Sequence, residues 1–161
     1  MKRTGRFYLL LLGQVLGIGV VLGFIFIDGI TLERWLEGEV DFAYPSQECD
    51  LRVSPCSITL ANGSTMELDI HPRGIPLMTP LSFSLHTTGI QTAELPLKIY
   101  ATNMDMGIHR FVFSHDGEGR YSAKGILPTC ISGNMHWHGE VTLEKQFQGK
   151  KIGAQFRFKT K

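Results

Sequence analysis

The chain has 161 residues, of which 16 are Lys or Arg and 15 are Asp or Glu, so its formal net charge at pH 7 is only +1. This balance gives no support for nucleic-acid binding, which needs a strongly basic face. The length is sufficient for one ordinary domain with its own core beside a short terminal segment.

The first predicted element is an uncharged apolar run at residues 7–27, FYLLLLGQVLGIGVVLGFIFI. A helix of this length covers roughly the 30 Å hydrocarbon thickness of a bilayer. Basic residues precede the run and all 15 acidic residues follow it, which predicts a cytoplasmic tail at residues 1–6 and a domain on the far side. The run is longer than a signal-peptide core and has no small-residue cleavage site after it, which favours an uncleaved anchor.

This pattern predicts a single-pass protein of a bacterial inner membrane, with its C-terminal domain in the periplasm. A eukaryotic type II membrane protein has the same topology and stays open as an alternative. Two small-xxx-small spacings in the anchor suit a helix–helix contact, although glycine is also simply common in membrane helices. The glycines concerned are Gly13, Gly17, Gly19 and Gly23.

Residues 28–48 are predicted to form a juxtamembrane helix and a linker. The helix is expected at residues 31–38, where Thr31 can cap its start and Gly38 can end it. Trp35 suits the boundary between membrane and water. Residues 39–48 contain Pro45 and are expected to link this helix to the domain.

Three cysteines, Cys49, Cys56 and Cys130, follow the anchor. An oxidising compartment favours a structural disulfide, and an odd number leaves one thiol over. All three pairings stay open at this stage. The spacing between Cys49 and Cys56 is too long for the C-x-x-C motif of a thioredoxin-type redox centre.

Residues 49–161 are predicted to form an antiparallel β-sandwich, because short runs of alternating polar and apolar residues are separated by Gly, Pro, Asn and Asp. Asn62-Gly63 is expected to turn between the first two strands, and the proline-rich residues 71–80 are expected to form a connection. The predicted strands are 57–61, 64–70, 81–85, 95–101, 109–113, 119–123, 135–143 and 152–158.

Two stretches of this domain are rich in methionine and histidine, NMDMGIH at 103–109 and GNMHWH at 133–138. Thioether and imidazole groups suit copper, and thioethers select Cu(I). Methionine is also an adaptable core residue that packs well on aromatic rings, which is the alternative interpretation. The candidate metal ligands are Met104, Met106, His109, Met135, His136 and His138.

The order of these motifs resembles the YtkA-like and FixH-like membrane-anchored periplasmic domains. The matching residues are M-x-M-G-x-H at 104–109, G-R-Y at 119–121, L-P at 127–128 and G-x-M-x-W at 133–137. The match covers about residues 95–143 and does not include the cysteines as part of its pattern. The resemblance implies an immunoglobulin-like sandwich on one N-terminal span, and a role in copper delivery and assembly of haem–copper oxidases.

The predicted function is therefore that of a membrane-anchored copper-binding or copper-delivery accessory protein, with a copper chaperone or an oxidase subunit as its partner. The alternative is a structural or interaction module of an inner-membrane complex that binds no metal. No hydrolase motif and no phosphate-binding glycine-rich loop is present in the sequence. We accordingly expect no enzymatic activity.

Overall fold

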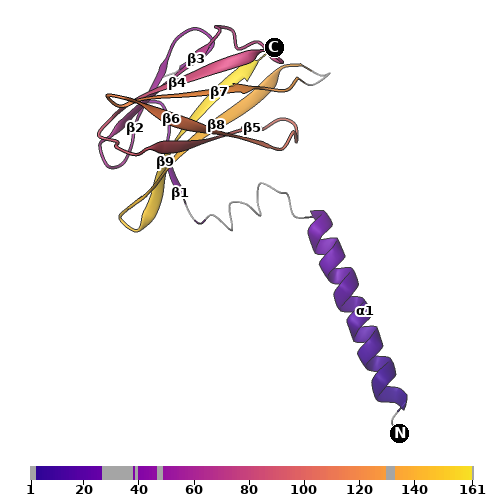
Figure 1. The fold of residues 1–161 in the computed structure, drawn as a ribbon. Helices are drawn as coiled ribbons and strands as arrows, with labels where there is room; N and C mark the ends of the chain where they lie inside the picture. The colour runs from indigo at the N-terminus through magenta and orange to yellow at the C-terminus, as the bar shows by residue number, and fades with distance from the viewer. Residues whose placement is uncertain (1–2, 27–37, 39, 47–48, 130–132, 161) are drawn as a thin grey trace. The chain divides into compact units, whose positions relative to one another are not determined.

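The computed structural model describes residues 3–26, 38, 40–46, 49–129 and 133–160. The chain divides into two compact units, Met1–Glu37 and Gly38–Lys161. Helix α1, Arg3–Phe26, belongs to the first unit, and nine strands make up the second (Figure 1).

Helix α1 is 24 residues long, and its apolar side chains between Phe7 and Leu22 are exposed. The helix predicted for this part of the chain is therefore confirmed. Within the described residues, no helix has the length and apolar character needed to cross a membrane. The last residue of the expected span, Ile27, and nearly all of the expected juxtamembrane helix lie outside the described residues, so both stay predictions.

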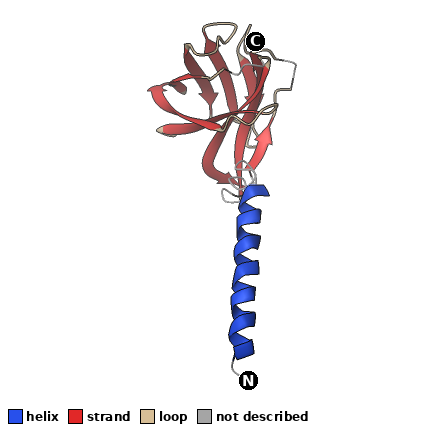
Figure 2. Ribbon diagram, turned by 90° about the vertical axis from the view of Figure 1, so that its right-hand side faces the viewer, coloured by secondary structure: helices blue, strands red, loops and turns tan. Residues whose placement is uncertain are grey.

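The second unit is mainly β, as predicted, and every strand expected from the alternation of polar and apolar residues is present (Figure 2). The alternation is clearest in β4, where every second side chain is buried. The strands are β1 Val40–Ala43, β2 Cys56–Thr59, β3 Thr65–His71, β4 Pro80–Thr88, β5 Glu94–Ala101, β6 Ile108–Gly117, β7 Arg120–Ile126, β8 Met135–Phe147 and β9 Lys150–Thr160.

The strands form one continuous nine-stranded sheet in the order β1-β9-β8-β5-β6-β7-β4-β3-β2. The predicted β-rich character of the domain is thus confirmed, whereas the predicted arrangement of two packed sheets is not. The two halves of the order are joined by the β6–β7 hairpin, which pairs Ser114 with Ser122 and has a register shift between His115 and Gly117. Because this pairing is confined to the hairpin end, the sheet curls and both halves bury side chains in one core.

The core is built from the inward-facing residues of β2 to β9. Trp137 on β8 and Tyr121 on β7 are its largest fully buried side chains. Both polar groups of these rings are satisfied: the Trp137 indole Nε1 donates to Thr160 Oγ1 at 2.9 Å, and the Tyr121 hydroxyl donates to the Thr92 carbonyl oxygen at 3.0 Å. Both aromatic residues therefore belong to the core with their polar groups hydrogen-bonded.

Strand β1 lies in a stretch that was expected to be a linker. It pairs in parallel with β9, with Val40 opposite Lys151 and Phe42 opposite Gly153. Gly153 makes room for the Phe42 ring, which a Cβ at that position would crowd. A strand of only four residues carries too little alternation to stand out in a sequence.

A disulfide joins Cys49 to Cys56, with their Cα atoms 5.8 Å apart. This resolves one of the three pairings left open by the sequence, and Cys130 lies outside the described residues. Asn62-Gly63 does turn the chain between β2 and β3, within a five-residue connection in which Gly63 adopts a φ of +82°. The Leu60 amide donates to the Ser64 carbonyl oxygen at 2.8 Å and closes this connection.

Candidate metal centre

The two methionine-rich stretches meet at one end of the sheet. The first forms the connection from β5 to β6, and the second opens β8, which pairs antiparallel with β5. The register places Ala101, the last residue of β5, opposite Trp137. The loop that carries Met104 and Met106 therefore leaves β5 close to Met135, the first residue of β8.

Asn103 fastens this loop to β8. Its side-chain Nδ2 donates to the Asn134 carbonyl oxygen at 3.0 Å, and its Oδ1 accepts from the His136 amide at 3.0 Å. These two partners flank Met135 on both sides. A single side chain thus ties the residue before Met104 to the residues before and after Met135.

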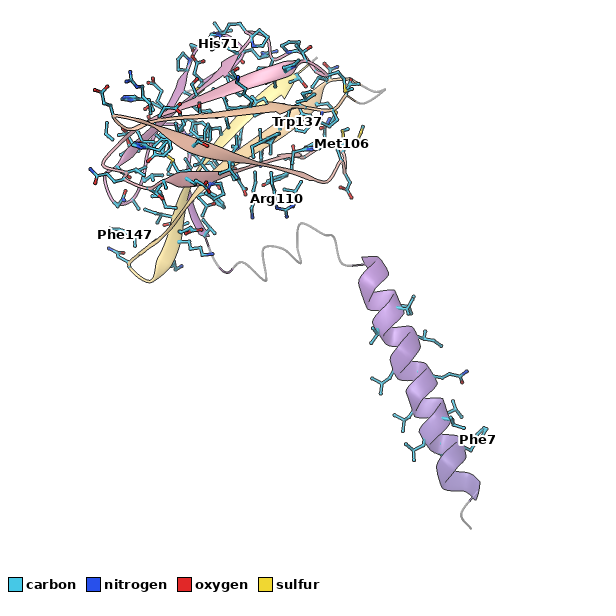
Figure 3. All side chains as sticks on the ribbon, viewed as in Figure 1. Phe7, His71, Met106, Arg110, Trp137 and Phe147 are labelled. Carbon is cyan, nitrogen blue, oxygen red and sulfur yellow. A yellow bond between two sulfur atoms is a disulfide. The ribbon has the colours of Figure 1, made fainter. Side chains whose placement is uncertain are left out.

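The three methionines differ in burial. Met135 is fully buried in the core, whereas Met104 and Met106 are half-buried and pack against the core. Figure 3 shows the Met106 side chain and the Trp137 ring near the same end of the domain. The Asp105 carboxylate accepts a hydrogen bond from the Gly107 amide at 3.1 Å. This contact shapes the tip of the β5–β6 loop, which carries Met104 and Met106.

His109 faces the core from the start of β6, on the same side of the strand as the buried Phe113. Its imidazole packs edge-on against the Trp137 ring, with ring centroids 6.2 Å apart. The Nε2 atom of His109 is buried, and no hydrogen-bond partner for it lies among the described residues. A buried imidazole nitrogen without a partner costs free energy unless something binds it.

His136 and His138 point away from these groups. Successive residues of a strand face opposite sides, so both histidines lie on the face of β8 opposite to Met135 and Trp137. The burial pattern agrees, because Met135 and Trp137 are fully buried while His136 is exposed and His138 half-buried. The structure therefore divides the predicted ligands into a core-facing group, Met104, Met106, His109 and Met135, and an outward-facing pair.

Met78 is a further thioether at this end of the domain that the sequence did not single out. Its amide donates to the Leu127 carbonyl oxygen at 2.9 Å, and Pro80 pairs with Ile126 at the end of β7. The side chain is exposed. A lone methionine between prolines has no sequence pattern that would mark it as a ligand.

The described residues hold no group of three or more His, Cys, Asp or Glu side chains placed to bind a metal ion. Methionine thioethers are a different donor type. A metal at this end of the sheet would therefore depend on thioethers together with the His109 imidazole.

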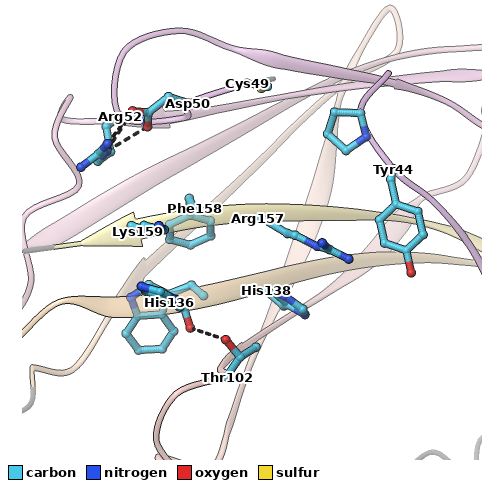
Figure 4. Close-up of a pocket in the computed structure, with 12 residues that line it drawn as sticks. Tyr44, Cys49, Asp50, Arg52, Thr102, His136, His138, Arg157, Phe158 and Lys159 are labelled. Atoms are coloured by element: carbon cyan, nitrogen blue, oxygen red, sulfur yellow. Dashed lines mark hydrogen bonds and ion pairs between the residues drawn. The ribbon is translucent and has the colours of Figure 1, made fainter. Parts of the chain in front are cut away.

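A pocket of about 780 Å³ lies on the outward face of β8 and β9 (Figure 4). Its floor includes His136 and His138 from β8 and Arg157 and Lys159 from β9. Tyr44, Asp50 and Arg52, which follow β1 in the chain, also line the pocket. The Arg157 guanidinium lies over the Tyr44 ring, 4.9 Å from its centroid.

Asp50 and Arg52 form a fork-like ion pair in the wall of this pocket. Arg52 Nε and Nη2 donate to the two carboxylate oxygens at 2.9 and 2.7 Å, and the Arg52 amide donates at 3.0 Å. The side-chain hydrogen bonds from Arg52 are the largest cause that holds the pKa of the Asp50 carboxyl below its usual value, and partial desolvation opposes it. Both carboxylate oxygens are thereby occupied.

The Asp50 pair predicts a pH-dependent contribution to stability. Since folding lowers the pKa of Asp50, the contribution is present above the unfolded value of about 3.9 and is lost as the pH falls through the folded value. Thermal unfolding of the wild type and Asp50→Asn between pH 2 and 7 should show a small stability difference that begins to shrink near pH 4 and is lost once the pH is below the folded pKa of Asp50. A difference that stays constant down to pH 2 would contradict this assignment.

No protein-family model, curated protein or solved structure matches this chain.

Proposed function

We propose that the chain is a copper-binding accessory protein that holds Cu(I) at the methionine-rich end of its β domain. The proposed ligands are the thioethers of Met104, Met106 and Met135 and the imidazole of His109. The observation that carries the proposal is the buried Nε2 atom of His109, which has no hydrogen-bond partner among the described residues and follows the loop of Met104 and Met106. An imidazole nitrogen kept free of hydrogen bonds is available to a metal ion.

The donor chemistry fits a soft monovalent copper ion. Thioethers are weak neutral ligands that prefer Cu(I), and imidazole binds copper in either oxidation state. The described residues bring no carboxylate cluster to this end that would select a hard cation. When bound, the ion would accept electron pairs from sulfur and nitrogen without any bond in a substrate being made or broken.

The setting of the loop suits transfer of the ion between proteins. Met104 and Met106 are half-buried, so part of each side chain is exposed to solvent, whereas Met135 is enclosed. A ligand set that is partly exposed permits exchange with ligands of a partner. We propose a copper chaperone or a subunit of a haem–copper oxidase as that partner, following the resemblance to the YtkA-like and FixH-like domains.

We further propose that α1 anchors the chain in a bacterial inner membrane and that the domain is periplasmic and immunoglobulin-like. The support is the uncharged run at residues 7–27, the exposure of its apolar side chains and the sign of the flanking charges. The antiparallel pairing of β3, β4 and β7 beside the group β6, β5, β8 and β9 supports an immunoglobulin-like arrangement. The disulfide fits an oxidising compartment.

The proposal is tested by a Cu(I) titration of the full-length chain in non-ionic detergent against a chromophoric chelator. His109→Phe keeps an aromatic ring against Trp137 but removes the free nitrogen, so we expect it to weaken Cu(I) binding by at least about tenfold. Equal binding by the wild type and this variant would refute the role of His109.

His115→Phe is the matched control. His115 lies on the same strand and packs against an aromatic ring, Tyr121, with ring centroids 4.8 Å apart. It lies at the opposite end of β6, and we expect its replacement to leave Cu(I) binding unchanged. If the wild type shows no saturable Cu(I) binding at all, the metal proposal fails and a metal-free interaction module is the better description.

A further inference from the structure

We propose that the pocket on the outward face of β8 and β9 binds a small molecule that carries a phosphate or carboxylate group. This inference does not depend on copper binding. It follows from four side chains that the pairing of two strands places together.

The floor of the pocket combines two cations of β9, Arg157 and Lys159, with two histidines of β8, His136 and His138. The β8–β9 register sets His136 directly opposite Lys159, and His138 directly opposite Arg157. All four side chains lie on the same face of the sheet and line the pocket. Arg157 and Lys159 are two residues apart on this face, so an anion held between the guanidinium and the ammonium group would interact with both charges.

The acids near the pocket do not neutralise its two cations, Arg157 and Lys159. Asp50 is the only carboxylate among the described residues that line the pocket, and both of its oxygens accept from Arg52. Glu140, the next acid along the same face of β8, is buried and accepts from Tyr100 and Gln155 at 2.6 and 2.8 Å. Arg157 and Lys159 have no carboxylate partner among the described residues.

Tyr44 gives the pocket an apolar wall and positions its strongest anion-binding group. Its ring supports the Arg157 guanidinium at 4.9 Å from the centroid, and Figure 4 shows the two side chains together at one side of the pocket. The Arg157 Nε and Nη2 atoms donate long hydrogen bonds to Gln155 Oε1 at 3.4 Å each, and the remaining N–H groups can donate to an oxyanion. The volume of about 780 Å³ is that of a small-molecule site.

The pocket is separate from the proposed metal centre, although the two share a strand. Met135 and Trp137 direct their side chains into the core, whereas His136 and His138 direct theirs outward. A variant on β9 therefore alters the pocket without touching a proposed copper ligand.

The test is calorimetric titration of the full-length chain, in non-ionic detergent at constant ionic strength, with inorganic phosphate in one series and citrate in another. We expect saturable one-to-one binding of at least one anion. Arg157→Gln and Lys159→Gln should each weaken it by about tenfold or more, since each removes a charge-assisted hydrogen bond. The preferred anion then tells whether the physiological ligand is a phosphate or a carboxylate compound.

Lys124→Gln is the matched control, because it removes one exposed positive charge from β7, outside the pocket. We expect its affinity for the anion to equal that of the wild type. Two results would overturn the proposal: neither anion saturates the wild type, or Lys124→Gln weakens binding as much as Arg157→Gln does. The second result would mean that only the general charge of the protein attracts the anion.

Discussion

Replacing Met104, Met106 and Met135 together with leucine is expected to weaken Cu(I) binding by more than about 100-fold. Changes to groups that only support a metal ligand already cost about 10- to 100-fold in affinity, and this variant removes three proposed ligands at once. Leucine is preferable to alanine because Met135 is fully buried. Exchange of methionine for leucine conserves volume and usually costs less than about 1.5 kcal/mol in a core.

The measurement is the Cu(I) titration against a competing chelator, with Met66→Leu as its control. Met66 is fully buried on β3, opposite Thr87, in the part of the domain away from the loop of Met104 and Met106. Its replacement should leave the copper affinity at the wild-type value. If the triple variant binds Cu(I) as tightly as the wild type, the thioethers are core residues and nothing more.

Gly119→Ala is expected to destabilise the domain more than any other single glycine substitution in a turn, by about 3 kcal/mol. Gly119 adopts a φ of +72°, which strains any other residue, and a Cβ there would collide with the backbone carbonyl oxygen of Thr87. The Gly119 carbonyl oxygen also accepts from the Thr87 amide at 2.7 Å and from the Thr87 hydroxyl at 3.1 Å. Relief of the collision would therefore break the junction between β4 and β7.

Thermal unfolding of the full-length variants measures this effect, and the expected loss corresponds to a fall in Tm of roughly 10 °C. Gly63→Ala is the control, since Gly63 has a similar φ of +82° but open space around its Cβ position. It should cost about 1 kcal/mol, from backbone strain alone. Equal losses in the two variants would show that the Thr87 contact does not contribute.

The sequence predicted the strands well because most of them bury one face only. In β3 and β4 polar and apolar residues alternate so regularly that the buried positions can be predicted from the residue types alone. The bounds were less accurate, and β8 and β9 extend beyond their predicted ends because Lys150 and Gln146 continue the ladder without an apolar pattern. Backbone pairing does not require alternation once a hairpin has begun.

The closure of the sheet could not be predicted. Whether two groups of strands form separate sheets or one curled sheet depends on a few pairs at the β6–β7 hairpin, where Ser114 meets Ser122. Nothing in the identity of two serines encodes that pairing. The parallel addition of β1 to β9 likewise joins residues from the two ends of the domain.

The candidate site was predicted in part. The sequence named the two methionine-rich stretches, and the pairing of β5 with β8 brings them together. The alternation along β8 places Met135 and His136 on opposite faces. The role of Asn103 was missed, because a side chain that bonds to the backbone of a distant strand leaves no sequence pattern. The inward orientation of His109 was also hidden, since it depends on where β6 begins.

The parallel pairing of β1 with β9 has a mechanical consequence. Tension applied between the segment before Val40 and the end of β9 acts along both strands in opposite directions, so that all the hydrogen bonds between them are sheared together. A hairpin under the same tension would open one pair at a time. The pairing of β1 with β9 therefore resists a pulling force through all four of its residue pairs at once. The rate of unfolding under force is set by how fast these four pairs separate together.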